Sequence, residues 1–184
     1  GDAPAVAPPR PGRSRARRHA AAGDALVGKL RDKAARLHVG PGDQPGIDMG
    51  PVITATHRER IQKLIDSGVA EGAKLVLDGR GFKVPGSEKG FFLGPTLFDQ
   101  VTTTMEIYRE EIFGPVLIVL RANNIDDAIA LVNGNPYGNG TAIFTRSGAH
   151  ARRFERDIEV GMVGINVPIP VPMAFFSFGG WKAS

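Results

Sequence analysis

The chain of 184 residues contains no cysteine. This absence excludes a disulfide framework and a thiolate metal site, and it leaves the chain without a cysteine nucleophile of its own. The histidines are scattered singly, and no two of them have the i, i+4 spacing that places two metal ligands on one face of a helix. They are His19, His38, His57 and His150. We therefore expect no metal site.

Long apolar runs are also missing. None approaches the roughly 18 residues that a membrane-spanning helix needs, so we expect no membrane partner. The hydrophobic content of 42% and the charged content of 23% are typical of a soluble globular protein. The length is sufficient for one domain with a real core.

The net charge of +4 comes from one terminal segment. Residues 1–22 hold five arginines and one aspartate, whereas the other 162 residues hold 18 basic and 18 acidic side chains. Because the body of the chain is electrically balanced, a nucleic-acid footprint on it has little support. We expect no nucleic-acid partner for this part.

Residues 1–22 consist mainly of Ala, Pro, Arg and Gly, with Val6 as their one large apolar side chain. Such a segment buries too little apolar surface to offset its ordering entropy, so we predict a disordered tail. Four interpretations of the segment stay open. It can be a transit peptide, a basic arm for nucleic acid, an out-of-frame product of GC-rich coding sequence or a plain solvated tail. We place the domain boundary between residues 22 and 23.

From residue 23 onward, helical and extended patterns alternate. Helices are predicted near 24–37, 53–72, 125–133 and 148–159, and strands near 74–79, 116–120, 140–145 and 160–167, with a long loop over 91–101. Asp24, a Thr56–Glu59 capping box and Ser147 are the expected helix starts. Strands separated by helices of about ten residues predict an α/β fold with a mainly parallel sheet and crossover helices.

The stretch "REEIFGPV", residues 109–116, contains two adjacent carboxylates before a buried strand. In an extended segment Glu110 and Glu111 point to opposite faces, so they do not form a general acid/base pair. A lone carboxylate at a strand end can accept two hydrogen bonds from the vicinal diol of a nucleotide ribose. Phe113 would lie on the same side as Glu111 and could pack on a flat heterocycle. The alternative is two surface charges that flank a buried strand.

Seven motifs, taken in order, resemble those of the aldehyde dehydrogenase superfamily. They are "GDQPGIDMGPVIT", "EGAKLVLDGR", "FFLGPTLFD", "REEIFGPV", "NPYGNGTAIFT", "VGMVGINV" and "SFGGWKAS". Within the superfamily, "LIDSGVAEGAKLVLDGR", "NPYGNGTAIFT" and "INVPIPVPM" look most like the CoA-acylating methylmalonate-semialdehyde dehydrogenases. The resemblance covers about residues 23–184, which it identifies as part of the catalytic domain of an aldehyde dehydrogenase-like fold.

The resemblance implies the chemistry and assigns roles. In this family a cysteine attacks an aldehyde, NAD on a separate Rossmann-like domain takes hydride, and in the acylating branch CoA accepts the acyl group from the thioester. By motif, Glu111 is similar to the glutamate that holds the nicotinamide ribose, and Phe113 to the aromatic residue near the nicotinamide. Phe178 matches a pocket-lining position for the aldehyde, and Asn166 belongs to the same rim. Glu110 receives no role.

The resemblance also shows what this sequence does not supply. The family's nucleophilic cysteine, its Rossmann-like domain and its oxyanion-hole asparagine belong upstream of residue 23. We therefore expect a C-terminal fragment of an NAD-dependent, CoA-acylating (methyl)malonate-semialdehyde dehydrogenase that is inactive alone. The alternative is an inactive remnant that at most associates with full-length subunits. The family implies a homo-oligomer in the bacterial cytoplasm or the mitochondrial matrix.

Overall fold

The structure is a computed structural model, and it describes residues 5–6, 14–18, 20–168, 174–175 and 179–184. The chain divides into two compact units. The described part of the first, which we call the α2 unit, is Ala25–Val119. The second, the β6 unit, is built on Leu120–Ser184 together with described residues from Ala5 to Asp24.

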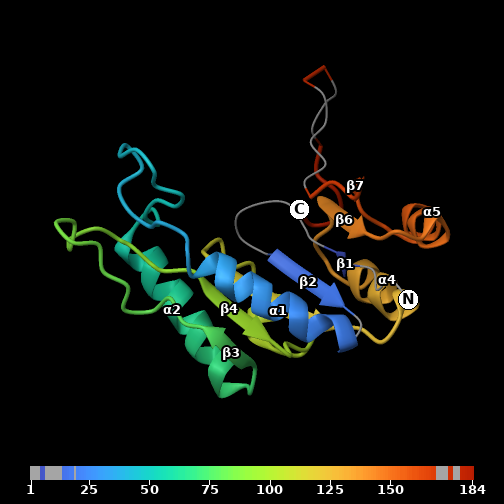
Figure 1. The fold of residues 1–184 in the computed structure, drawn as a ribbon, viewed down its shortest axis with the longest axis horizontal. Helices are drawn as coiled ribbons and strands as arrows, with labels where there is room; N and C mark the ends of the chain where they lie inside the picture. The colour runs from blue at the N-terminus through green and yellow to red at the C-terminus, as the bar shows by residue number, and fades with distance from the viewer. Residues whose placement is uncertain (1–4, 7–13, 19, 169–173, 176–178) are drawn as a thin grey trace. The chain divides into compact units, whose positions relative to one another are not determined.

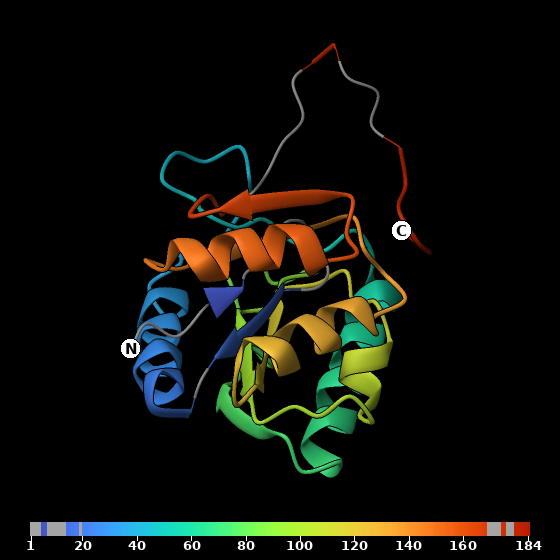
Figure 2. The same ribbon diagram turned by 90° about the vertical axis from the view of Figure 1, so that its right-hand side faces the viewer.

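The α2 unit contains three strands in the order β3-β4-β5 (Figure 1). Strand β3 is antiparallel to β4, and β4 is parallel to β5. The elements are α1 (Ala20–Ala34, in this unit from Ala25), α2 (Ala55–Ala70), β3 (Lys74–Leu77), β4 (Thr96–Asp99), α3 (Glu106–Arg109) and β5 (Val116–Arg121). Helix α1 lies over one face of these strands, and α2 and α3 lie over the other (Figure 2).

Helix α2 is held by its apolar stripe and by one small residue. Ile61, Leu64 and Ile65 are buried at the helical spacing that the sequence predicts. At Gly68 a Cβ atom would lie 2.7 Å from Cδ1 of Ile107, so the glycine allows α3 to approach α2 closely. The stripe therefore fixes the rotation of α2 against the core, which decides where its polar side chains point.

The β6 unit contains strands in the order β2-β1-β6-β7. Strand β1 pairs antiparallel with β2 and β6, whereas β6 and β7 are parallel and are joined through α5. Its elements are β1 (Ala5–Val6), β2 (Ser14–Arg18), α4 (Ile125–Asn133), β6 (Gly140–Phe144), α5 (Gly148–Asp157) and β7 (Met162–Ile165). Ile125 and Ile129 of α4 pack with Ile143 of β6 and Phe154 of α5 in one buried cluster.

The predicted α/β class is confirmed, including parallel strand pairs joined by helices. The helix start at Ser147 is also confirmed, because its side chain accepts a hydrogen bond from the backbone N–H of His150. Helix α2 instead has Thr54 as its N-cap, whose hydroxyl accepts a hydrogen bond from His57 N–H, so the Thr56–Glu59 capping box was wrong. Strand β4 lies inside the long loop predicted over 91–101, so that prediction was wrong for these four residues, and α3 lies where no helix was predicted.

Residues 5–6 and 14–18 are strands in the structure, where the sequence predicted disorder. Helix α1 begins at Ala20, so Asp24 lies inside the helix and is not its N-cap. The run of alanines before Asp24 has the highest helix propensity of any residue type, which favours this earlier start. The domain boundary at residue 22 and the origin of the segment stay predictions. Within the described ranges, no helix is both long and apolar enough to cross a membrane.

Candidate functional site

The segment from Glu110 to Gly114 connects α3 to β5 in the α2 unit. Helix α3 ends at Arg109, and Glu110 has an extended backbone, with φ −81° and ψ 141°. Ile112 is buried and anchors the segment in the core. Phe113 then has a φ of +50°, in the left-handed region that a bulky residue rarely adopts. The extended alternation that we assumed therefore does not continue as far as Phe113.

His57 in the first turn of α2 holds this unusual backbone. Its Nε2 lies 2.8 Å from the carbonyl oxygen of Phe113. A carbonyl oxygen only accepts hydrogen bonds, so the Nε2 atom of the ring carries the hydrogen and donates it. With the backbone turned in this way, the Phe113 side chain is 55% exposed.

Arg60, on the same helix, holds the preceding two residues. Its Nη1 donates to the carbonyl oxygen of Glu111 at 3.0 Å, and its Nη2 lies 3.4 Å from Oε2 of Glu110. The two glutamates thus have different environments. The Glu110 carboxylate is exposed and ion-paired, whereas the Glu111 side chain is half-buried and has no hydrogen bond or ion pair to the described residues.

Gly114 lets the segment lie directly against α2. A Cβ atom at this position would be 2.6 Å from Cδ1 of Ile61, which is completely buried. Ile61 is one turn beyond His57 on the helix, so His57, Arg60 and Ile61 form one continuous line of contacts to the segment. His57 and Arg60 were not among the predicted site residues. Their position could have identified them, because they lie one helical turn before Ile61 and Leu64 and so on the same face of α2 as its apolar stripe.

This arrangement fits one half of a dinucleotide site. A carboxylate without a protein partner can accept two hydrogen bonds from a ribose diol. The Phe113 ring is exposed, and His57 and Arg60 hold the segment that carries it. Such a ring can pack against a flat heterocycle. The protein groups in the described residues leave both functions open, so contact of Glu111 and Phe113 with NAD stays a prediction.

The other two predicted site residues belong to the β6 unit. Asn166 follows β7 with a φ of +58°, and its amide forms two hydrogen bonds with the backbone of Thr145. Its Oδ1 accepts from Thr145 N–H at 2.9 Å, and its Nδ2 donates to Thr145 O at 3.0 Å. The side chain thus links the ends of β6 and β7, and the place of Asn166 at the rim of an aldehyde pocket stays a prediction. Phe178 lies outside the described residues.

No cluster of three or more His, Asp or Glu side chains that could hold a metal ion is present in the described residues. The polar groups around Phe113 are a cation, an imidazole and two carboxylates, of which one carboxylate is already paired. Such a set can bind and orient a polar ligand. Among the described residues of this segment there is no nucleophile with an adjacent base.

The sequence profile of the aldehyde dehydrogenase family matches residues 13–184. The chain belongs to the aldehyde dehydrogenase family. The family match begins at residue 13, so it extends into residues 1–22, ahead of the predicted start near residue 23. The predicted resemblance to this family is confirmed.

Individual aldehyde dehydrogenases show the extent of the similarity. A malonate-semialdehyde dehydrogenase of Pseudomonas aeruginosa is 58% identical over 161 residues, which are 88% of this chain and 32% of that protein. An acylating, mitochondrial methylmalonate-semialdehyde dehydrogenase of Arabidopsis thaliana is 60% identical over 156 residues, 85% of this chain and 26% of that protein. The chain thus spans about a third or less of the length of these relatives.

A solved aldehyde dehydrogenase structure agrees in fold. It is the crystal structure of a protein described as a methylmalonate-semialdehyde dehydrogenase from Sinorhizobium meliloti 1021, complexed with NAD. The TM-score is 0.86 at 52% sequence identity, and the match covers 89% of this chain and 33% of that chain. The likeness supports the α/β fold of the aldehyde dehydrogenases for the described elements.

Proposed function

We propose that this chain forms part of an NAD-dependent, CoA-acylating dehydrogenase that oxidises methylmalonate or malonate semialdehyde to an acyl-CoA. The observation that carries the proposal is the pair Glu111 and Phe113: an unpaired, half-buried carboxylate close in sequence to an exposed ring whose backbone His57 fixes. The names of the Pseudomonas and Arabidopsis relatives support the semialdehyde substrate.

In the proposed enzyme this part of the chain binds and orients the cofactor. The Glu111 carboxylate accepts hydrogen bonds from the hydroxyls of the nicotinamide ribose, and the Phe113 ring packs near the nicotinamide. NAD, when bound, would accept the hydride that leaves the former aldehyde carbon after a nucleophile has added to it. His57 and Arg60 act on the cofactor indirectly, because they hold the backbone carbonyls of Phe113 and Glu111. In the β6 unit, Asn166 and Phe178 are proposed to line the aldehyde pocket.

The covalent step needs a group that this sequence lacks. Oxidation through a thioester requires a cysteine nucleophile, and the chain has none. We propose that the nucleophile and the dinucleotide-binding domain belong to the part of the relatives that this chain does not span. Transfer of the acyl group to CoA is proposed from the word "acylating" in the name of the Arabidopsis relative.

The proposed assembly and location follow the family. We propose that the whole enzyme is a homo-oligomer and acts on a small-molecule aldehyde. The relatives include a protein from a bacterium and one whose name places it in mitochondria, so the proposed compartments are the bacterial cytoplasm and the mitochondrial matrix.

A hybrid protein tests the function. Residues 23–184 would replace the matching third of the Pseudomonas malonate-semialdehyde dehydrogenase, which supplies the missing parts. We expect the hybrid to form NADH from both semialdehydes and to require CoA for full turnover. We expect the 184-residue chain alone to form no NADH. Turnover by the chain alone would contradict the need for a second part. A folded hybrid that neither binds NAD nor turns over would favour the alternative, an inactive remnant that at most associates with full-length subunits.

A further inference from the structure

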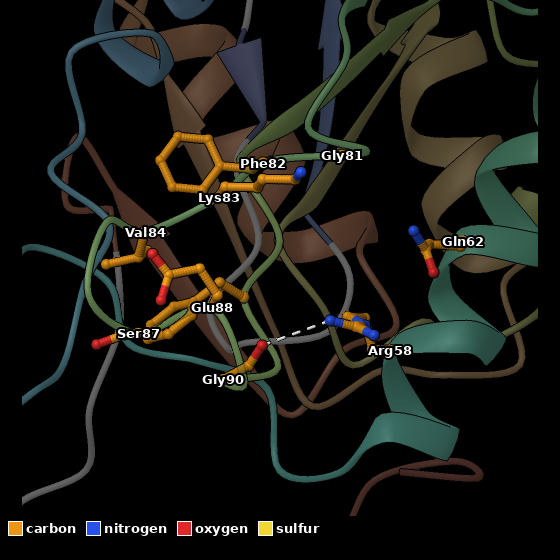
Figure 3. Close-up of a pocket in the computed structure, with 10 residues that line it drawn as sticks. Arg58, Gln62, Gly81, Phe82, Lys83, Val84, Ser87, Glu88 and Gly90 are labelled. Carbon is orange, nitrogen blue, oxygen red and sulfur yellow. Dashed lines mark hydrogen bonds between the residues drawn. The ribbon is translucent and has the colours of Figure 1, made fainter.

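The α2 unit contains a pocket formed by α2 and the loop of residues 81–92 (Figure 3). Its volume is about 340 Å³, within the range of roughly 300–1,000 Å³ of small-molecule sites. Helix α2 contributes Arg58 and Gln62, one turn apart, and both extend toward the loop. His57 and Arg60 contact residues 110–113, so the pocket uses different side chains of the helix from the proposed cofactor site.

The floor of the pocket is part of a small core. Val84 and Phe92 line the pocket, are only 9% and 6% exposed, and pack together with Val39. This cluster connects the loop to the segment before α2. Phe82, at the rim, is 41% exposed and adds a second aromatic wall.

Arg58 lacks a partner for its charge in this pocket. Its Nε is buried and has no hydrogen-bond partner in the described residues. Its Nη1 donates to Gly90 O at the long distance of 3.4 Å, and its guanidinium carbon lies 6.0 Å from the centre of the Phe91 ring. An arginine stays charged at any physiological pH, and a buried donor without an acceptor is unfavourable. The Nη2 atom of Arg58 has no hydrogen bond to the described residues, so it can donate to an acceptor in the pocket that the described chain does not supply.

The other charged side chains that line the pocket do not pair with Arg58. Lys83 is an exposed second cation, with no ion pair to the described residues. Glu88 is the carboxylate in the lining, and its Oε1 accepts from the backbone N–H of Gly86 at 2.9 Å. Backbone hydrogen bonds from Glu88 and Gly86 hold the pKa of this carboxyl below its usual value. Glu88 is thus engaged with its own turn and is not paired with Arg58.

We propose that this pocket binds a small organic oxyanion, a carboxylate or phosphate group attached to an apolar or flat body. Arg58 binds the oxyanion through its guanidinium, with Lys83 beside it at the rim. The body of the ligand lies against Phe82, above the floor of Val84 and Phe92. The site is independent of the proposed cofactor role of Glu111 and Phe113, so each can fail without the other.

Calorimetric titration of the 184-residue chain tests the site with four probes. Phenyl phosphate and benzoate carry both parts of the proposed ligand, inorganic phosphate carries the anion alone, and phenol carries the body alone. We expect saturable binding of phenyl phosphate or benzoate that weakens with added salt, and weaker binding of the two partial probes. The tighter of the two complete probes shows whether the oxyanion is a phosphate or a carboxylate.

Variants connect the binding to the pocket. Arg58→Gln is expected to weaken the better probe about tenfold or more, because it removes a hydrogen-bonded charge. Lys83→Gln should weaken it by a smaller factor, and this variant remains informative if Arg58→Gln does not fold, since Lys83 is exposed. Lys63→Gln removes an exposed cation of α2 outside the lining and should have no effect. Absence of saturable binding, or equal losses in the Lys83 and Lys63 variants, would overturn the proposal.

Discussion

The Nε2 atom of His57 lies 2.8 Å from the carbonyl oxygen of Phe113, and this contact joins the first turn of α2 to a residue in a left-handed conformation. The two residues are 56 positions apart in the sequence. The backbone strain at Phe113 is therefore held by a tertiary hydrogen bond. Strain of this kind persists where the surrounding structure fixes it, and it is frequent at ligand sites.

Removal of the imidazole should release the Phe113 backbone. We expect His57→Ala to lower the free energy of unfolding of the 184-residue chain by about 1 kcal/mol, the usual net contribution of one hydrogen bond. His57→Gln keeps a side-chain donor and should retain most of the free energy of unfolding. Urea unfolding measures this free energy for both variants. In the hybrid, His57→Ala should raise the KM for NAD and leave the dependence on CoA concentration unchanged; an unchanged KM would show that His57 has a structural role alone.

We expect a smaller side chain at position 113 to leave the folded chain at least as stable as Phe113 does. Asparagine tolerates a φ of +50° better than phenylalanine, and the Phe113 ring is largely exposed, so little burial is lost. We expect Phe113→Asn to leave the thermal unfolding midpoint of the chain unchanged or higher, and to weaken NAD binding in the hybrid. A clear fall in the midpoint would mean that the ring is more important for packing than its exposure indicates.

The two adjacent glutamates provide a matched pair of variants. Glu111→Gln removes the charge of an unpaired carboxylate that is proposed to bind the ribose, and Glu110→Gln removes the charge of the carboxylate that faces Arg60. In the hybrid, we expect Glu111→Gln to raise the KM for NAD about tenfold or more, as for loss of a charged hydrogen bond. Glu110→Gln should change it less than about threefold, because exposed ion pairs contribute little. Equal effects would contradict the proposed role of Glu111.

The close contact between Gly114 and Ile61 should leave no room for a larger residue at position 114. A Cβ atom would lie 2.6 Å from Cδ1 of the buried Ile61. Gly114→Ala is expected to destabilise the chain by roughly 1–3 kcal/mol, the usual cost of overpacking a core. Gly42→Ala is the control, because no atom lies within 4 Å of a Cβ placed there. Urea unfolding of the two variants would show equal stability if the contact at Gly114 were not tight.

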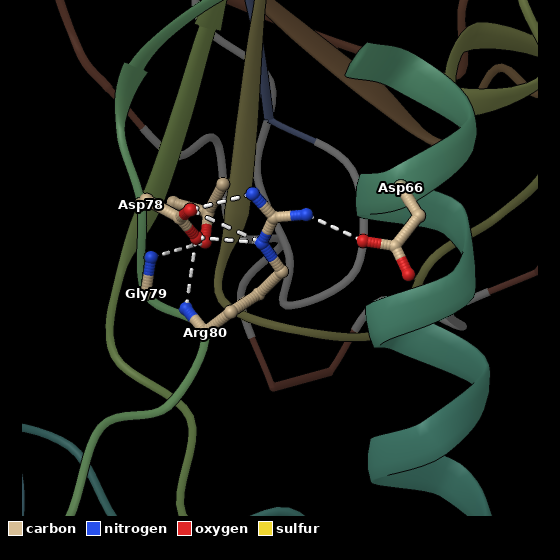
Figure 4. A network of polar contacts seen from close by, with 5 residues as sticks. Asp66, Asp78, Gly79 and Arg80 are labelled. Carbon is tan, nitrogen blue, oxygen red and sulfur yellow. Dashed lines mark hydrogen bonds and ion pairs between the residues drawn. The ribbon is translucent and has the colours of Figure 1, made fainter. Parts of the chain in front are cut away.

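The pH dependence of stability should report the ion pairs of Arg80 (Figure 4). Its guanidinium binds Asp66 on α2, and its Nη2 lies 2.6 Å from Oδ2 of Asp78. Hydrogen bonds from the Arg80 side chain lower the pKa of Asp78. A carboxyl with a lowered pKa in the folded state contributes stability above its ordinary pKa of about 4, and that contribution is lost as the pH falls below this value.

Asp78→Asn should therefore flatten the fall in stability of the chain at acid pH. Both partners are partly exposed, so the expected loss at neutral pH is about 1 kcal/mol or less. Asp43→Asn, at an exposed carboxyl with no ion pair in the described residues, is the control. Thermal unfolding between pH 2 and pH 7 compares the three proteins. Identical pH profiles for the parent chain and Asp78→Asn would contradict the assignment.

Local patterns were sufficient where a short stretch of sequence decides the structure. The run Val116–Leu120, the helix after Asn124 and the cap at Ser147 follow from apolar continuity, helical spacing and a hydroxyl at a helix start. Strand β4 and helix α3 have four residues each, too few for either period to be recognised. Their structure comes from pairing with β5 and from packing against α2.

The sequence by itself determined the α/β class, the family resemblance and the absence of a cysteine nucleophile, because these depend on residue types and their order. It also selected Glu111 and Phe113 as candidates. Only the tertiary structure decided that Glu110 is paired with Arg60, that Phe113 has a left-handed backbone, and that His57 holds it. These features depend on contacts between a helix and a loop about 50 residues apart, and the packing of Ile61 against Gly114 brings the two together.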